Sequence, residues 1–248
     1  MKELTPRDKT KSADYYLDWA AEQEKRINGI LENGPVILLG GLPRDCRNVA
    51  LACYCAGESP TKCRKWFAQS ADCLLKFWQV KSFHLPDYWG GDEELILLSA
   101  AFLGGKASDV VTAFRSLKFD RPPVPRVRGV MEQYCALLVN EPTGQNEDEM
   151  RDIEKKGRDW ITLPPLFKAV GERDQEKFAG TLESYLAKSW SKAAKNARSV
   201  LRYPHLTYLG CYSLLAAALS QMMDNVPALP AQLRDYIPVD LITGKKPG

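Results

Sequence analysis

The sequence is poor in histidine and lacks the complete motifs that commonly mark catalytic sites. Only two histidines are present, His84 and His205, and they lie far apart in the chain. No G-x-S-x-G, H-E-x-x-H or G-x-G-x-x-G motif occurs, and Gly104-Gly105-Lys106 is only the tail of a phosphate-binding loop without its first glycine. Because most acid–base and metal mechanisms rely on such residues, we expect a protein that is not an enzyme and uses no cofactor.

Net charge and long apolar segments are also scarce. The 34 basic and 31 acidic residues leave a formal charge of +3, which is too nearly balanced to indicate a nucleic-acid partner. Residues 1–7 lack the apolar core of a signal peptide, so we expect no secretion by that route. The longest apolar stretch, Leu206–Met223, is interrupted by polar residues such as Ser213 and Gln221. We therefore expect a buried helix there and no contact with a membrane.

Cysteine, in contrast, is well represented, with seven residues in the chain. The number is odd and the cysteines lie on apolar helical patterns, which is typical of reduced, buried thiols in a cytoplasmic protein. Cys53-Tyr54-Cys55 does not have the spacing of a zinc-binding pair, because residues two apart point to different faces of a helix. We expect core thiols and no metal site.

Hydrophobic spacing predicts an all-α fold. A stripe of period 3.6 predicts a first helix over about residues 8–33, and the apolar run Leu95–Leu103 favours a buried helix, with a strand as the alternative. Three polar residues are candidate N-caps of later helices: Ser59 before Pro60, Ser108, and Asp174.

The length and the helical pattern indicate one domain of stacked antiparallel helical hairpins over residues 1–248. Arg121-Pro122-Pro123-Val124-Pro125 cannot form regular helix, so the domain can divide near residues 118–126 into lobes 1–117 and 126–248. Ala56-Gly57-Glu58 and Val170-Gly171-Glu172 each separate two predicted helices, which favours a stack of similar hairpins.

Charged residues form two acidic clusters and one basic stripe, each a candidate contact surface. The acidic clusters consist of Glu147, Asp148, Glu149, Asp152 and Glu154, and of Asp92, Glu93 and Glu94 with Trp89 just before them. Acidic residues in a first turn also stabilise a helix through its dipole, and this structural alternative stays open. The basic stripe consists of Lys188, Lys192, Lys195, Arg198 and Arg202, for which a solvated helix face and a phosphate-binding surface are the two alternatives.

Several segments near the two ends of the chain carry a family resemblance. They are Arg7-Asp8 and Tyr15-Tyr16 before a long charged helix, the run Leu182–Trp190, the run Tyr208–Ser213, and Tyr236-Ile237-Pro238-Val239-Asp240-Leu241 at the end. Together they resemble the PoNi-type immunity proteins and related all-α immunity proteins of bacterial polymorphic toxin systems, such as the type VI secretion system.

The resemblance implies a cytoplasmic antitoxin in interbacterial competition. Such a protein binds a cognate toxin in a one-to-one complex and blocks its active site, and a nuclease is the favoured toxin. A nuclease has a basic cleft, so the acidic clusters are the favoured contact surface. The alternative function is a tetratricopeptide-like adaptor for protein–protein interaction, and a third is an RNA-binding helical repeat that uses the basic stripe.

Overall fold

The computed structural model describes residues 12–82, 84–87, 92–121, 125–143, 147–156, 160–200 and 213–223. These residues are mostly helical, so the predicted all-α class is confirmed. The helices are α1 (Ala13–Asn33), α2 (Val36–Leu39), α3 (Leu42–Cys55), α4 (Pro60–Val80), α5 (Asp92–Leu103), α6 (Ala107–Arg115), α7 (Pro125–Leu138), α8 (Glu147–Lys156), α9 (Leu163–Gly171), α10 (Gln175–Val200) and α12 (Leu214–Met222).

Polar side chains cap the N-termini of three of the long helices. The backbone N–H of Lys62 donates to Ser59 Oγ over 3.3 Å, and that of Lys177 donates to Asp174 Oδ1 over 3.0 Å, which confirms both predicted caps. Ser12 caps α1 in the same way. The prediction for Ser108 is wrong, because α6 begins at Ala107 and Ser108 lies inside its first turn.

Five helices are followed by a residue in the left-handed backbone region. These residues are Gly57, Ser82, Gly105, Asn140 and Arg173, with φ values of 75°, 52°, 74°, 55° and 54°. The N–H of each residue donates to a carbonyl of the last helical turn, and after the four other than Ser82 the N–H of the next residue does so too. The predicted match of Gly57 with Gly171 is therefore out of register, because Gly171 still belongs to α9 and Arg173 makes the turn.

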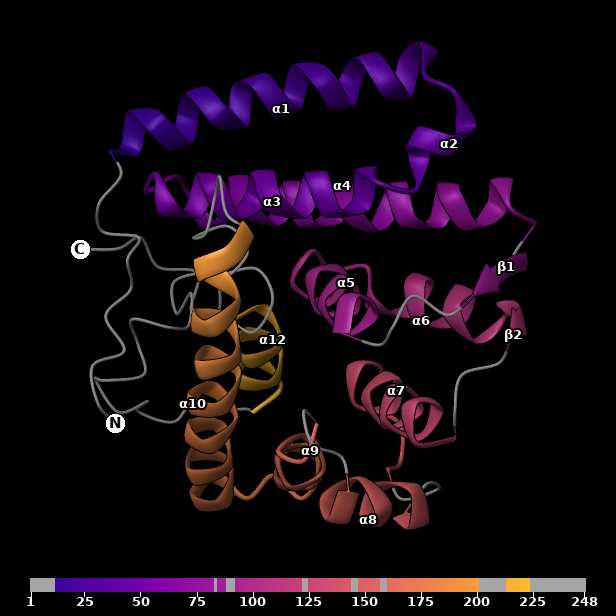
Figure 1. Ribbon diagram of the computed structural model, residues 1–248, viewed down its shortest axis with the longest axis vertical. Helices are drawn as coiled ribbons and strands as arrows, with labels where there is room; N and C mark the ends of the chain where they lie inside the picture. Colours follow the sequence, from indigo (N-terminus) through magenta and orange to yellow (C-terminus); the bar gives the residue numbers. More distant parts are fainter. Residues whose placement is uncertain are drawn as a thin grey trace.

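The helices are arranged in layers that run in different directions (Figure 1). Helix α1 lies along the α3–α4 hairpin, α5 and α6 form the next layer, and α7, α9 and α8 lie beyond it. Helix α10 runs across these layers on one side, in contact with α9, while α12 packs on α5. The α3–α4 pair is a helical hairpin, but a regular stack of hairpins through the whole molecule is not confirmed.

Two short strands form a parallel pair that the sequence did not predict. Strand β1 (His84–Asp87) pairs with β2 (Lys118–Arg121), with Leu85 opposite Phe119. Strand β2 lies in the proposed boundary at residues 118–126, and one cluster of buried side chains includes residues from both sides of it. The division into two lobes stays a prediction.

Helix α5 lies at the centre of the buried hydrophobic core. All its residues from Glu94 to Ala101 are buried, which confirms a buried helix over Leu95–Leu103 and excludes the strand alternative. At its end Gly104 lies against the backbone of α4, where an added Cβ would be 2.5 Å from the nitrogen of Ala68. Close packing therefore requires glycine at this position.

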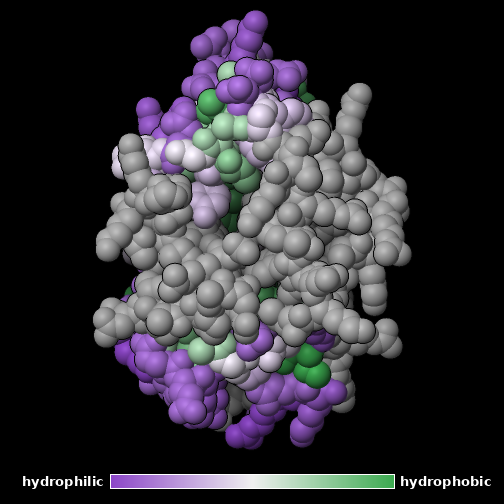
Figure 2. Space-filling view, turned by 90° about the vertical axis from the view of Figure 1, so that its left-hand side faces the viewer, coloured by the Kyte–Doolittle hydropathy of each residue, from purple (hydrophilic) through white to green (hydrophobic). Residues whose placement is uncertain are grey.

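Polar residues cover the outer helices. Figure 2 shows the outer surface of α1 as mostly hydrophilic, with hydrophobic residues beneath it, where it faces the next layer. The buried residues of α1 are Tyr16, Ala20 and Ile27, as its periodicity predicts. Within the described ranges, none of the helices has the length and apolar character needed to cross a membrane.

Candidate functional site

The two predicted acidic clusters lie on different helices, one in the first turn of α5 and the other along most of α8. We call Asp92, Glu93 and Glu94 the α5 cluster, and Asp148, Glu149, Asp152 and Glu154 the α8 cluster. Helices α5 and α8 lie in different layers, so the structure does not bring the clusters together (Figure 1). Trp89 lies outside the described residues, as does the side chain of Glu147, although its backbone begins α8.

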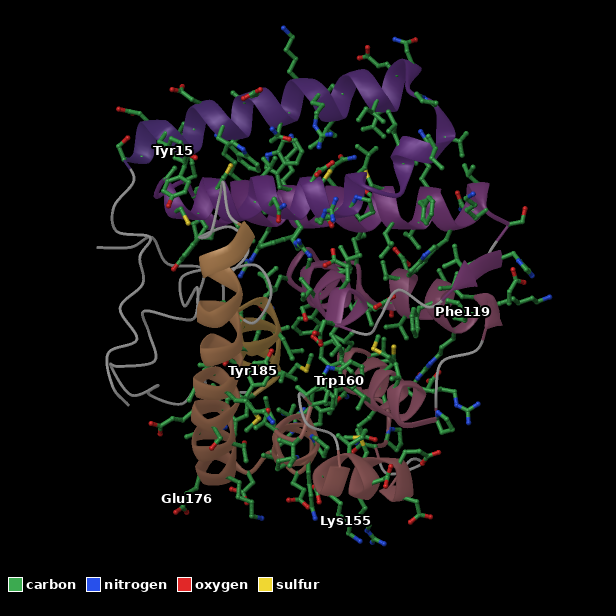
Figure 3. The ribbon with its side chains drawn as sticks, viewed as in Figure 1. Tyr15, Phe119, Lys155, Trp160, Glu176 and Tyr185 are labelled. Carbon is green, nitrogen blue, oxygen red and sulfur yellow. The ribbon has the colours of Figure 1, made fainter. Side chains whose placement is uncertain are left out.

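The α5 cluster is used within the fold. Glu93 accepts a hydrogen bond over 2.9 Å from Arg47, a side chain of α3 that is only 4% exposed. Asp92 accepts one over 2.6 Å from the indole Nε1 of Trp160, which points into the molecule from the segment before α9 (Figure 3). Glu94 is buried. This cluster therefore joins α5 to α3 and to the start of α9, and little of it is presented to a partner.

The α8 cluster faces outward. The side chain of Asp148 is 96% exposed and lies 3.8 Å from Arg151 of the same helix. Glu154 is also exposed, and α8 lies at the edge of the molecule with Lys155 pointing away from it (Figure 3). On the opposite face of α8, Met150 and Ile153 are buried against the core. The helix is thus held in place while Asp148 and Glu154 remain accessible and Glu149 and Asp152 are half-buried.

Four of the five members of the predicted basic stripe lie on one helix. Helix α10 extends from Gln175 to Val200 and carries Lys188, Lys192, Lys195 and Arg198. The side chain of Lys188 is half-buried, and those of the next members of the stripe lie outside the described set. Arg202 also lies outside the described residues.

An apolar surface on α2 is a further candidate that the sequence analysis missed. Val36, Ile37 and Leu38 are exposed, Ile37 to 78%, and only Leu39 of this turn is buried. A single helical turn can direct only part of its side chains toward the core, so the remaining ones face solvent. The signal in the sequence was an apolar run bounded by Pro35 and Gly40, too short for a helix with two faces.

A pocket adjoins this apolar turn. It has a volume of about 350 Å³ and is lined by Gly40, Gly41, Arg44, Glu93 and Leu97. Gly40 packs on the ring of Phe77, where an added Cβ would lie 3.2 Å from the nearest ring atom. We refer to Val36, Ile37 and Leu38 together with this pocket as the α2 surface.

Three further side chains of types that often serve in catalysis, His84, Ser99 and Tyr134, contact other residues of the fold. His84 Nε2 lies 3.3 Å from Asp120 Oδ1 across the two strands, and both side chains are exposed. Ser99 and Tyr134 are hydrogen-bonded over 2.6 Å in the core, and burial raises the pKa of the Tyr134 hydroxyl. Ser99 also donates to the carbonyl of Leu95, so its hydroxyl is held inside α5.

Most described cysteines are buried, as predicted. Cys46, Cys53, Cys63, Cys73 and Cys135 are buried and Cys55 is half-buried, whereas Cys211 lies outside the described residues. The sulfurs of Cys46 and Cys73 lie 3.9 Å apart between α3 and α4, and the hydrogen bond with Cys73, together with burial, raises the pKa of Cys46. Among the residues that the structure describes, no three histidine, cysteine or acidic side chains are grouped to hold a metal ion.

Comparison with known proteins found no matching family model, no matching curated protein and no matching solved structure.

Proposed function

We propose that this protein is an immunity protein that binds a bacterial toxin in a one-to-one complex and blocks its active site, with a nuclease as the toxin. The proposal rests on the segments that resemble PoNi-type immunity proteins. The observation that carries it is the outward-facing α8 cluster, held on a helix that Met150 and Ile153 anchor in the core.

The chemistry of a nuclease explains why such a cluster suits it. A protein that acts on nucleic acid carries a positive cleft, and a locally concentrated negative surface can occupy that cleft even when the net charge of the inhibitor is near zero. Only a local feature can supply this complementarity here, because the whole chain carries +3. Asp148 and Glu154 are exposed and accessible for such contacts.

The α5 cluster makes a smaller contribution to this proposal. Glu93 and Asp92 already accept hydrogen bonds from Arg47 and Trp160, and a contact with toxin would have to replace or share those bonds. We therefore assign the main toxin contact to α8. Trp89 and the side chain of Glu147 stay predicted members of the contact.

Genomic position and co-expression test the proposed function. An immunity gene is expected directly beside the gene of its toxin, so the neighbouring gene is expressed in a host bacterium with and without this protein. We expect toxicity from the neighbour alone, normal growth with both, and a one-to-one complex on size-exclusion chromatography with light scattering. If the neighbour is harmless, or if this protein binds several harmless proteins without protecting cells, the adaptor function replaces the immunity function.

A further inference from the structure

The apolar turn of α2 is presented to solvent in a fixed position. Pro35 begins the turn and accepts a hydrogen bond from the N–H of Leu38 over 2.9 Å, while the buried Leu39 anchors its end. Monomeric proteins seldom expose adjoining large aliphatic side chains, and where they do the patch commonly marks a binding surface. Ile37 is the most exposed of the three and stands in the middle of the turn.

Among the residues that the structure describes, the pocket beside the turn has one uncompensated positive charge. Two of its described lining residues are charged, Arg44 and Glu93. Glu93 is paired with Arg47 over 2.9 Å, so its negative charge is already balanced. Arg44 is exposed and forms no ion pair with any residue in the described part of the chain. A guanidinium in this state is well suited to bind a carboxylate through two parallel hydrogen bonds.

We propose that the α2 surface is a second docking site, which takes a protein segment that carries a large aliphatic side chain beside a carboxylate. The aliphatic side chain packs on Ile37 and Leu38, and the carboxylate binds Arg44 at the mouth of the pocket. The partner is thus acidic at this surface, whereas the partner of the α8 cluster is basic.

A second copy of this chain fits the surface less well. In a symmetric dimer the same patch faces itself, so each Arg44 would approach a surface whose free charge is also positive. The three aliphatic side chains also cover far less than the roughly 800 Å² that each partner buries in a stable complex. Charge and area together favour a short acidic–aliphatic segment over a copy of this chain.

Two short labelled peptides test the proposed chemistry. Both are designed as helices with leucines on one face, and the residues flanking the leucines are glutamate in one peptide and lysine in the other. Fluorescence anisotropy is measured with the full chain. We expect the glutamate peptide to bind at least about tenfold more tightly than the lysine peptide, which corresponds to about 1.4 kcal/mol.

Variants locate the binding to this surface. Ile37→Asp and Arg44→Glu are each expected to weaken binding of the glutamate peptide about tenfold, and Arg44→Glu is also expected to bind the lysine peptide more tightly than the parent does. Ile161→Asp and Arg128→Glu change an exposed isoleucine and an exposed arginine elsewhere, and binding is expected to be unchanged. Circular dichroism verifies that all four variants are folded.

Three results would overturn the docking site. They are equal binding of the two peptides, no binding of either peptide, and binding that survives both Ile37→Asp and Arg44→Glu. A monomer–dimer equilibrium that Ile37→Asp abolishes would assign the surface to a second copy, and would also overturn it. The peptide measurements use no toxin, so a failed toxin complex leaves the docking site standing, and a failed docking site leaves protection through α8 intact.

Discussion

The α5 and α8 clusters both begin in the first turn of a helix, although the α8 cluster extends along most of its helix, and they have different neighbours. Arg47 and Trp160 approach the first turn of α5 from α3 and from the segment before α9. Asp148 lies 3.8 Å from Arg151 of the same helix. Similar acidic sequences therefore join helices to one another in one place and leave Asp148 and Glu154 exposed to solvent in the other. The neighbours that the fold supplies decide which of these two roles applies.

The largest expected effect comes from breaking the ion pair of the α5 cluster. Glu93→Ala leaves the charge of Arg47 buried without its carboxylate, and we expect the free energy of unfolding to fall by about 3 kcal/mol. Asp148→Ala in the α8 cluster is the matched change, with an expected loss of about 0.5 kcal/mol or less. Urea unfolding of both variants measures the difference.

A double variant sharpens this contrast. Arg47→Met combined with Glu93→Leu removes both charges, so we expect it to recover much of the stability that Glu93→Ala loses. Equal losses for Glu93→Ala and Asp148→Ala would show that the two clusters do not differ in the way the structure indicates.

The second largest loss of stability is expected from removing the hydrogen bond between Trp160 and Asp92. Trp160→Phe keeps an aromatic ring but removes the indole N–H that donates to Asp92, and a hydrogen bond to a charged group contributes about 1.5–3 kcal/mol. We expect a loss near the lower end of that range, because Asp92 is only half-buried. Asp92→Asn retains an oxygen acceptor and should lose less. Thermal unfolding compares the three proteins, and an unchanged midpoint for Trp160→Phe would contradict the assigned contact.

Thiols provide a third comparison of buried and accessible groups. Burial raises the pKa of Cys63 to about 12 and that of Cys135 to about 12, from an ordinary value of 9.0. Above pH 9 the unfolded chain therefore loses protons that the folded chain keeps. Each thiol is expected to lower the free energy of unfolding by up to about 1.4 kcal/mol per pH unit, whereas below pH 9 its contribution to stability is fully present.

Urea unfolding at about pH 8 and about pH 10 measures this loss. Cys135→Ala should have a smaller difference between the two conditions than the parent, although it is less stable in both. If the variant and the parent lose the same stability between the two pH values, the pKa of Cys135 does not differ between the folded and unfolded states. In native protein we expect the half-buried Cys55 to react with a thiol reagent before the buried thiols do.

The smallest effect on stability is expected from the α8 cluster. The quadruple charge reversal changes Glu147, Asp148, Glu149 and Asp152 to lysine. We expect a loss of about 1 kcal/mol, mainly from the helix dipole, and an unchanged helical circular dichroism signal. Under the proposed function the same variant should no longer protect cells from the toxin, since the complementary surface is reversed.

Reversal of the basic stripe is the matched control for function. Lys188, Lys192 and Lys195 are changed to glutamate in the same background, and protection is expected to persist. If the α8 variant protects and the stripe variant does not, the toxin presents an acidic surface and the nuclease assignment is wrong.

Local patterns predicted the helices well where they were long or well capped. Ser59 and Asp174 begin their helices as predicted, because capping depends on residues within one turn. The continuous apolar run of α5 indicated a buried helix for the same reason. At Ser108 the local pattern predicted the wrong N-cap, because Lys106 occupies the N-cap position of α6 without a side-chain hydrogen bond.

The contact surfaces were predicted less well. Three acidic residues in a row at Asp92–Glu94 suggested exposed charge, yet Glu94 is buried and its neighbours are bonded inside the fold. The α2 turn differs in the opposite direction. A short apolar run is ordinarily assigned to the core, yet three of its four side chains are exposed. Both differences arise because burial depends on residues distant in sequence.

The sequence by itself determined the helical class, the positions of most helices and the burial of most described thiols, since these follow from periodicity and capping over a few residues. Only the tertiary structure decided that Arg47 and Trp160 engage the α5 cluster, that β1 and β2 pair, and that Ile37 and Arg44 face solvent beside one pocket. Each of these features joins segments that are separated in the chain, and the packing of whole helices brings such segments together.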